Sequence, residues 1–351
     1  MRVVHVHRMR GIGGSERHLL TLLPALAERG LDVAFVGLDD PDWDPVDFYG
    51  ALTVPALRLR SARDVDPLLL ARLVRGLRAD IVHTHLVHAD LYGGLAAKLR
   101  GTTLVSTKHN DDPFRRGPFR HVERQLVRMA DRVITITDAL RDFTIEQIGA
   151  SEAKVQTIHY GLDGLPQAWG ENFADEVPRD VPVLLSTARL TRQKGIDVAI
   201  RALPEGAVLV VLGEGPERAA LEALARDLGV ADRVFLLGRV PDVTSWLRRA
   251  TVYVHPARWE GFGLGVLEAM HASLPVVATR VSSLPELVVD GETGYLVQSD
   301  DPPALAAAIA RALDEPQLGA AGRERAVAEF SVARMADRHA ALYATLASAS
   351  S

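Results

Sequence analysis

Residues 181–213 read VPVLLSTARLTRQKGIDVAIRALPEGAVLVVLG, and this stretch indicates the fold class. Two near-continuous runs of Val, Leu and Ile enclose a charged loop and a segment with helical spacing. Strands that are apolar on both faces are typical of parallel sheets covered by helices on either side. The stretch therefore predicts a β–α–β unit of an α/β protein.

The same alternation of strands and helices runs through the rest of the chain. Further strand-like runs lie at 2–7, 32–38, 80–85, 103–108, 132–137, 233–238, 251–256 and 274–279. A turn-rich stretch, GLDGLPQAWGENFADEVPRD (161–180), separates two such series. We therefore expect two Rossmann-like domains with parallel sheets facing across a cleft. The expected boundaries are an N-terminal domain over 1–165, a linker over 166–180, a C-terminal domain over 181–330, and a C-terminal helix over 331–351 that packs back on the N-terminal domain.

The amino-acid composition argues against several classes of protein. The chain has 351 residues, a formal net charge of −5 and no cysteine. No run approaches the ~18–20 apolar residues that cross a bilayer. The first strand-like run, RVVHVH, alternates apolar residues with histidine, unlike a signal peptide. We expect a cytoplasmic protein without disulfides or thiolate metal sites, and without a nucleic-acid partner.

The loop after the strand at 251–256 combines glycines with two carboxylates. In ARWEGFGLGVLEAMHASLPVVAT (257–279), Glu260 and Glu268 lie eight residues apart and enclose Gly261, Gly263 and Gly265. A helix that begins near Leu264 offers free N–H groups to an anion. Because carboxylates accept hydrogen bonds from hydroxyls, the pair fits a polyol beside a phosphate. The alternative is a tight turn with two solvated glutamates.

Other strand ends of this domain carry cations and glycines. Arg189 and Lys194 follow the strand at 181–188, beside a helix start near Gly195, and two cations there suit a diphosphate. Solvated surface charge is the alternative for an isolated pair. Gly213 opens another turn, GEGPE, at the end of the next strand. Ligands of open α/β sheets bind beyond the carboxyl ends of the strands, so these loops form the candidate site.

A set of motifs in this half resembles a known family. EGFGLGVLEA, RLTRQKG, VLGEGPE, LGRVPD and LPELVVDGETGYLV occur in the same order in retaining glycosyltransferases of family four, the glycosyl transferases of group 1. The resemblance covers nearly the whole chain and is strongest over 181–300. It implies the GT-B fold, with an N-terminal acceptor domain and a C-terminal nucleotide-sugar donor domain. Ser282 and Ser283 stand where many members have a Gly-Gly pair, so the role of that loop is open.

The resemblance also implies roles for single residues. Arg189 and Lys194 would neutralise the donor diphosphate, and Glu260 would hydrogen-bond sugar hydroxyls. Glu268 would hold the ribose, and His109 would contact the donor sugar near its reacting carbon. A loop histidine bonded to local backbone is the alternative for His109. The catalytic set is then His109, Arg189, Lys194 and Glu260. The donor-binding set is Gly13, Gly14, Gly213, Arg239, Val240, Phe262, Gly263, Leu264, Gly265 and Glu268, with Arg239 and Val240 at the nucleobase.

The glycine-rich loop GIGG (11–14) follows the first strand and raises a second enzyme class. A nicotinamide dehydrogenase needs G-x-G-x-x-G there, but Glu16 occupies the place of the third glycine. In the resembling family the matching loop lies by the donor diphosphate and the acceptor. Gly13 and Gly14 are therefore expected to admit close approach of phosphate or acceptor.

The expected reaction is transfer of a sugar from a nucleoside-diphosphate sugar to a hydroxyl, with retention of anomeric configuration. UDP-sugars are the first expectation and GDP-sugars the next, and the acceptor is a glycan, a lipid-linked molecule or a small molecule. A sugar phosphorylase or a nucleotide-sugar epimerase on the same fold is an alternative. A non-catalytic nucleotide-sugar-binding module is an alternative of another class.

Histidines of the first half offer a metal site as an alternative. Two pairs share a strand face by their period of two and are followed by a further histidine and an aspartate: His5, His7, His83, His85, His88 and Asp90. Neither their spacing nor the nearby carboxylates match a standard site, so we expect no metal and no other cofactor. The nucleotide-sugar is a substrate.

A basic cluster, FRRGPFRHVERQLVR (114–128), places Arg120, Arg124 and Arg128 along one helix face. A solvated face is the commoner explanation of such a pattern. A basic face also fits anionic lipid. Weak peripheral contact through 114–128 with the inner face of the membrane is therefore a hypothesis for this segment.

Overall fold

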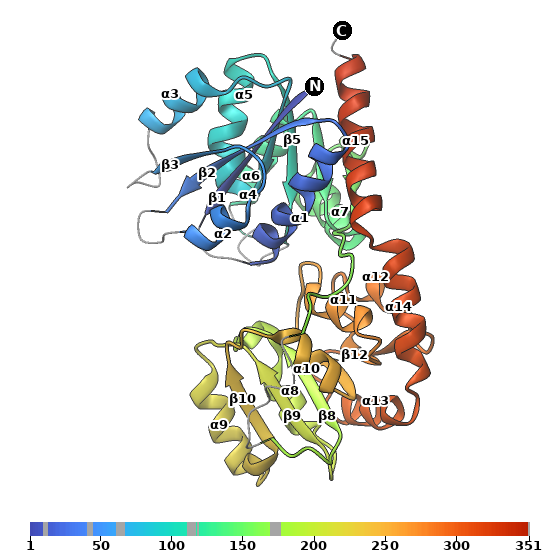
Figure 1. The fold of residues 1–351 in the computed structure, drawn as a ribbon. Helices are drawn as coiled ribbons and strands as arrows, with labels where there is room; N and C mark the ends of the chain where they lie inside the picture. Colours follow the sequence, from blue (N-terminus) through green and yellow to red (C-terminus); the bar gives the residue numbers. More distant parts are fainter. Residues whose placement is uncertain are drawn as a thin grey trace. The chain divides into compact units, whose positions relative to one another are not determined.

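In the computed structural model, the chain forms two compact units (Figure 1). The structure describes residues 1–9, 13–40, 45–60, 67–110, 117, 119–168 and 177–349. Unit 1 comprises Met1–Gly161 and Phe330–Ser351, and unit 2 comprises Leu162–Glu329. The chain therefore leaves unit 1 once and returns to it for the last helix.

Unit 1 is built on a parallel sheet, with seven strands among the described residues in the order β3-β2-β1-β4-β5-β6-β7. The strands are β1 (Arg2–Met9), β2 (Asp32–Asp39), β3 (Ala56–Arg60), β4 (Ile81–His85), β5 (Thr103–Lys108), β6 (Arg132–Thr135) and β7 (Val155–Thr157). The helices are α1 (Gly14–Glu28), α2 (Val46–Ala51), α3 (Pro67–Gly76), α4 (Leu86–Ala89), α5 (Leu95–Leu99), α6 (Arg120–Met129), α7 (Asp138–Phe143) and α15 (Val332–Ala349). A π-helical segment, Asp90–Gly94, joins α4 to α5.

Unit 2 has a second parallel sheet, with six strands among the described residues in the order β10-β9-β8-β11-β12-β13. The strands are β8 (Val183–Thr187), β9 (Val208–Leu212), β10 (Val234–Gly238), β11 (Val252–His255), β12 (Val276–Thr279) and β13 (Gly294–Val297). The helices are α8 (Ile196–Arg201), α9 (Arg218–Asp227), α10 (Val243–Arg249), α11 (Leu264–His271), α12 (Leu284–Leu287), α13 (Pro302–Asp314) and α14 (Gln317–Glu329).

Both sheets reverse their strand order at one point, which is the signature of a Rossmann-like domain. The reversal lies between β1 and β4 in unit 1 and between β8 and β11 in unit 2. The predicted fold class, α/β with two parallel-sheet Rossmann-like domains, is confirmed. Ligands of such sheets bind in the crevice beyond the strand ends at the reversal. The loops after β1, β4, β8 and β11 are therefore the places to look for a site.

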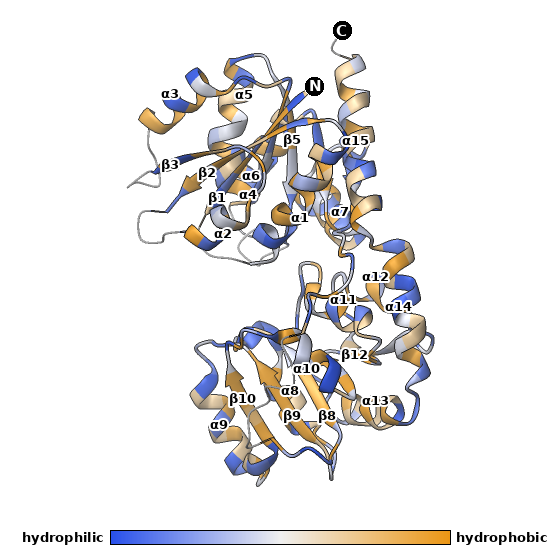
Figure 2. Cartoon of the chain, viewed as in Figure 1, coloured by the Kyte–Doolittle hydropathy of each residue, from blue (hydrophilic) through white to orange (hydrophobic). Residues whose placement is uncertain are grey.

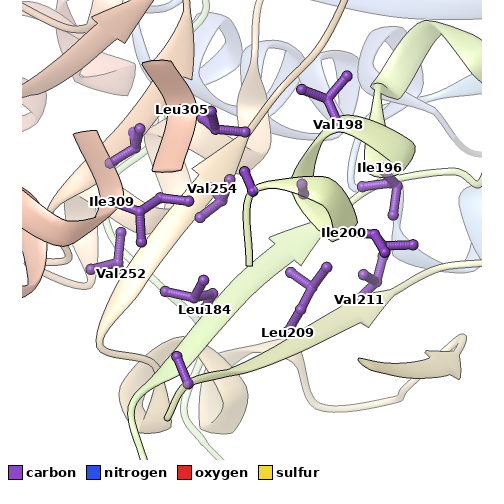
Figure 3. Packing of buried hydrophobic residues seen from close by; sticks show 14 of the residues in the cluster. Leu184, Ile196, Val198, Ile200, Leu209, Val211, Val252, Val254, Leu305 and Ile309 are labelled. Atoms are coloured by element: carbon purple, nitrogen blue, oxygen red, sulfur yellow. The ribbon is translucent and has the colours of Figure 1, made fainter. Parts of the chain in front are cut away.

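Apolar side chains fill the core of unit 2. Figure 3 shows Val211 of the sheet beside Ile200 of α8, and Val254 beside Ile309 of α13. The strands β8, β9 and β11 are buried at almost every position, as expected when helices cover both faces of a sheet. In Figure 2 these strands are predominantly hydrophobic, whereas the helices outside them carry hydrophilic stretches.

The last helix completes the core of unit 1. Helix α15 packs beside α1 against one face of the sheet, and it contributes Met335, Leu342 and Tyr343 to the core (Figure 1). An Arg29–Asp337 ion pair of 2.6 Å joins α1 to α15. Among the described residues, no helix is long and apolar enough to span a membrane.

Candidate active site

In unit 2, the loop between β8 and α8 lies against the loop between β11 and α11. Gly195 is the contact point, because its φ is +64° and a Cβ there would lie 1.9 Å from the carbonyl oxygen of Pro256. The N–H of Arg258 donates to the carbonyl of Gln193 at 2.7 Å, and Gln193 Nε2 donates to the carbonyl of Trp259 at 3.0 Å. Only glycine fits at Gly195, so the two loops are held in fixed register.

This contact between the two loops brings together two residues that lie 66 positions apart in sequence. Lys194 Nζ donates to Glu260 Oε2 at 2.6 Å, and the two side chains are 15% and 10% exposed. His255, the last residue of β11, places its Nε2 2.7 Å from the same oxygen. The other oxygen, Oε1, accepts the N–H of Gly261 at 3.0 Å. A largely buried carboxylate therefore lies at the reversal point of the sheet, with three donors on it.

The electrostatics of this cluster keep Glu260 ionised. Burial by itself would raise the pKa of the carboxyl, but the positive charge of Lys194 and the hydrogen bond from His255 outweigh it. The pKa of Glu260 therefore lies well below its usual range. A carboxylate only accepts hydrogen bonds, so the Nε2 of His255 carries a proton.

The start of α11 lies next in the chain after this carboxylate. Gly263 is the N-cap with a φ of +100°, and Leu264 begins the helix where the sequence predicts. At Gly265, a Cβ would come within 2.4 Å of the Tyr253 hydroxyl oxygen, so the first turn packs tightly on β11. Phe262 is buried, whereas Glu268 is half-buried one turn inside the helix. The free N–H groups of the first turn favour an anion beside Glu260.

The loop that carries Ser282 and Ser283 hydrogen-bonds to the loop that carries Glu260. Ser282 has a φ of +45°, a conformation that glycine adopts at least cost. Its Oγ accepts the N–H of Glu260 at 3.4 Å, and Ser283 Oγ donates to the carbonyl of Phe262 at 2.9 Å. The serines thus provide side-chain contacts that a Gly-Gly pair lacks.

The remaining predicted residues of unit 2 follow strand ends. Arg189 is exposed, and its guanidinium forms no ion pair with any residue that the structure describes. Arg239 is exposed and Val240 half-buried, directly after β10. Gly213 has a packing role, because a Cβ there would lie 2.1 Å from the carbonyl oxygen of Ala188. Arg189 is thus an available cation on the loop that also carries Lys194.

In unit 1, the glycine loop ends in a capped helix. Gly13 is the N-cap of α1, and its N–H donates to Glu16 Oε2 at 2.9 Å. Glu16, which stands in the place of a third glycine, thus caps the start of the helix with its side chain. Gly13 and the following Gly14 are both exposed, whereas 10–12 lie outside the described residues.

Buried histidines line the face of the same sheet that α1 and α15 cover. Hydrogen bonds link three of them in a row: His5 Nδ1 to His85 Nε2 at 2.9 Å, and His85 Nδ1 to His109 Nε2 at 3.0 Å. His109 Nδ1 bonds to the hydroxyl of Tyr160. Both ring nitrogens of His109 are therefore engaged inside unit 1, and the residue is buried.

Burial favours the neutral form of five histidines on this face. It lowers the pKa of His5 to about 3 and that of His339 to about 4, and it places the pKa of His18, His83 and His85 well below the usual value.

The nitrogens of His5, His83 and His85 lie within 4.8 Å of one another, a spacing that a metal ion could bridge. His83 bonds through both nitrogens, however, to the hydroxyls of Tyr343 and Thr107 at 2.6 Å each. Its ring also stacks on that of His85 at 4.3 Å and 27°. Lone pairs of stacked rings do not converge on one point, so these residues fit hydrogen bonding better than metal ligation.

The basic face of α6 is only partly exposed. Arg120 and Arg128 face solvent, whereas Arg124 Nε donates to the carbonyl of Ile148 at 2.8 Å and is half-buried. Residues 111–116 and 118 lie outside the described residues. The helix therefore presents two of its three aligned arginines.

Comparisons with known proteins agree with this arrangement. The family described as glycosyl transferases group 1 matches residues 170–328, and Glycosyltransferase Family 4 matches residues 12–163. The chain belongs to the group 1 glycosyltransferases. The matches cover both units, and the predicted membership of family four is thereby confirmed.

Two relatives and one solved structure illustrate the range of this glycosyltransferase family. The D-inositol 3-phosphate glycosyltransferase of Streptomyces avermitilis is 33% identical over 69% of this chain, which spans 59% of that protein. The lipopolysaccharide core biosynthesis mannosyltransferase LpcC of Rhizobium leguminosarum is 29% identical over 96% of this chain and 94% of its own length. The structure of Anabaena HepE with UDP and glucose is 21% identical with a TM-score of 0.83, over 98% of this chain and all of that one. This likeness confirms the GT-B fold.

Three contacts of the candidate residues in the two units were not predicted from the sequence. His255 had no motif of its own, although its position at the end of β11 was a usable signal. Tyr160 follows the short strand β7 and meets His109 only through the fold. The hydrogen bonds from Ser282 and Ser283 to the Glu260 loop depend on a strand order that a single sequence does not show.

Proposed function

We propose that this group 1 glycosyltransferase transfers a sugar from a nucleoside-diphosphate sugar to an acceptor hydroxyl, with retention of anomeric configuration. The observation that carries the proposal is the cluster of Lys194, Glu260 and His255 at the sheet reversal of unit 2. A buried, ionised carboxylate beside a lysine and a helix start offers groups for both sugar hydroxyls and phosphates.

The roles follow from charge. Departure of the nucleoside diphosphate leaves negative charge on the phosphates, and Arg189 and Lys194 would stabilise it. The N–H groups at the start of α11 add to this field. Glu260 would hold sugar hydroxyls, and Glu268, one turn further, would hold the ribose. Arg239 and Val240 would meet the nucleobase.

His109 requires a modified role. Its two ring nitrogens bond to His85 and Tyr160, and burial keeps the histidines around it neutral. We therefore propose a binding role for His109 rather than a proton-transfer role. The acceptor proton would pass to the leaving diphosphate, and proximity of the acceptor hydroxyl would supply the remaining acceleration.

The donor and acceptor are proposed by class. UDP-sugars come first and GDP-sugars next, in keeping with the HepE structure in complex with UDP and glucose and with a relative named as a mannosyltransferase. The acceptor is a glycan, a lipid-linked molecule or a small molecule such as the inositol 3-phosphate of another relative's name. Unit 1 would provide the acceptor site.

We also propose that no metal is required. The sequence holds Asp-x-Asp triplets at 40–42, 42–44 and 64–66, but 41–44 and 61–66 lie outside the described residues. Turnover that persists in excess EDTA supports the proposal, and loss of turnover that Mn²⁺ or Mg²⁺ restores overturns it.

The proposed placement is cytoplasmic, with Arg120 and Arg128 as the groups that could touch anionic lipid. Vesicle co-sedimentation at low salt tests this contact. Failure to sediment with anionic vesicles removes it.

The test of function combines a ligand screen with product analysis. A thermal-shift panel of UDP, GDP, ADP and TDP and their sugars identifies the donor, since a ligand that binds only the folded state stabilises it. Turnover is then measured with and without added phosphate. Products that depend on phosphate point to a phosphorylase, an isomerised donor points to an epimerase, and binding without turnover points to a binding module. We expect Lys194→Ala and Glu260→Ala each to abolish transfer in a folded protein.

A further inference from the structure

We propose that His255 is a positioning residue that holds Glu260 in place while Lys194 is drawn to the donor diphosphate. The inference rests on the proposed function and concerns a residue that the family motifs leave out. It follows from how the three donors divide the two oxygens of one carboxylate.

The two donors on Oε2 differ in mobility. Lys194 reaches Glu260 through a flexible four-carbon stem from a loop, and its side chain is 15% exposed. His255 reaches the same oxygen from the end of β11, with a side chain only 4% exposed. Its ring stacks on Tyr253 with an interplanar angle of 12°, and the Tyr253 hydroxyl lies 2.7 Å from Thr187 Oγ1 of the neighbouring strand β8. Lys194 can therefore turn to a ligand, whereas His255 is fixed to the sheet.

Hydrogen bonding also fixes which ring nitrogen of His255 acts on Glu260. Its Nε2 donates to the carboxylate, which only accepts hydrogen bonds. The other nitrogen, Nδ1, is buried and has no hydrogen-bond partner among the described residues. Within the described residues, the ring therefore has Glu260 as its one hydrogen-bond partner.

Lys194 and His255 therefore have different roles in the cluster. When an incoming diphosphate attracts Lys194, its bond to Glu260 weakens, and a carboxylate held only by that lysine would follow it. The bonds from His255 and from the N–H of Gly261 remain, so Glu260 keeps its orientation toward sugar hydroxyls. Loss of His255 should therefore weaken recognition of the sugar but not of the nucleoside diphosphate.

The experiment compares His255→Gln, whose amide retains a donor in the place of Nε2, with His255→Leu, which has none. Calorimetric titrations of the full chain measure the dissociation constants of UDP and UDP-glucose, and of GDP and GDP-mannose. We expect His255→Leu to weaken nucleotide-sugar binding by about tenfold or more, as for a lost hydrogen bond to a charged group, with the diphosphate constant changed by less than about threefold. His255→Gln should stay within about threefold of wild type for both ligands.

Two further variants complete the design. His271→Leu, a half-buried histidine at the end of α11, is the matched control and should change neither constant. Lys194→Ala should weaken the binding of the diphosphate and of the nucleotide-sugar by the same factor, because His255 still holds Glu260. The ratio of the two dissociation constants is then unchanged. Adding His255→Leu to Lys194→Ala should remove the preference for the nucleotide-sugar over the diphosphate.

Three results would overturn the proposal. The first is that His255→Leu keeps the wild-type selectivity for the nucleotide-sugar over the diphosphate. The second is that His255→Gln and His255→Leu lose the same amount of affinity for the nucleotide-sugar. The third is that His255→Leu loses affinity for the diphosphate and the nucleotide-sugar in parallel. The last would show a structural role only. Failure of the proposed function looks different, because the wild-type protein would then bind neither the diphosphates nor their sugars, or would bind them without turnover.

Discussion

At the scale of single residues, unit 1 contains a lysine with almost no exposure to solvent. Lys108 Nζ lies 2.5 Å from Asp90 Oδ2 and 3.9 Å from Glu123 Oε1, and all three side chains are at most 3% exposed. Asp90 Oδ1 also accepts from Thr84 Oγ1 at 2.5 Å and from Ser106 Oγ at 2.6 Å. The lysine thus compensates two carboxylates inside the fold.

Lys108→Met keeps the length of the side chain but removes the ammonium group that Asp90 and Glu123 share. We expect it to lower the free energy of unfolding by about 3–5 kcal/mol, as for a broken buried pair. Lys98→Met is the control, because the Lys98–Asp131 pair is 35% and 41% exposed and should contribute less than about 1 kcal/mol. Urea unfolding of the full chain measures both, and equal effects of the two variants would contradict the account.

The sequence was informative about single residues only where a motif carried them. Lys194 and Glu260 each stood in a motif after a strand, so both could be predicted, and the fold brings them to 2.6 Å. Their direct pairing could not be predicted, because it depends on β8 and β11 being neighbours in the sheet. The engagement of both nitrogens of His109 had no local signal either, since its partners lie on other elements.

At the scale of elements, the strands that the sequence did not predict lie at the edges of the sheets. β3, β7 and β13 are edge strands of three to five residues. β3 reads ALRLR and is mostly exposed, so it lacks the continuous apolar run of a central strand. Central strands such as β9, buried at all five positions, gave a strong signal. A long apolar run, rather than burial alone, therefore decided what a single sequence revealed, since the predicted edge strand β10 is mostly half-buried and the short unpredicted strand β13 is mostly buried.

The hydroxyl of Tyr343 on helix α15 hydrogen-bonds to the histidine face of unit 1. Tyr343→Phe removes the partner of His83 Nδ1 inside the core, and we expect it to cost about 1–3 kcal/mol of unfolding free energy. Asp337→Ala on the same helix removes the pair with Arg29, in which Asp337 is 68% exposed, and should cost less than about 1 kcal/mol. Chemical denaturation compares the two variants. A larger cost for Asp337→Ala would show that α15 is held by its surface contact instead.

At the scale of the whole molecule, the histidines should make unit 1 sensitive to acid. Burial lowers the pKa of His5 to about 3 and that of His339 to about 4, against about 6.5 in an unfolded chain. Below pH 6.5 the unfolded chain binds more protons than the folded one, so stability falls as the pH falls from 6.5 toward 4.

Each such histidine should cost on the order of 1 kcal/mol between pH 7.5 and 5.5. In unit 2 the low pKa of Glu260 also makes stability fall as the pH falls, but this loss begins only below about pH 4.5, the usual pKa of a glutamate. We therefore expect unit 1 to lose stability first in calorimetric scans at decreasing pH. Prior loss of the unit 2 transition would refute the assignment of neutral buried histidines.

The central claim is that the loops after β8 and β11 bind a nucleoside diphosphate through Arg189 and Lys194. The most direct measurement is a calorimetric titration of UDP and GDP into wild type, into Arg189→Ala/Lys194→Ala, and into Arg120→Ala/Arg128→Ala, which changes the net charge equally on the exposed face of α6. We predict that wild type and the α6 variant bind at least one of the two diphosphates with the same affinity, and that the Arg189/Lys194 variant binds it about a hundredfold more weakly or worse. Equal affinity in all three proteins would contradict the account.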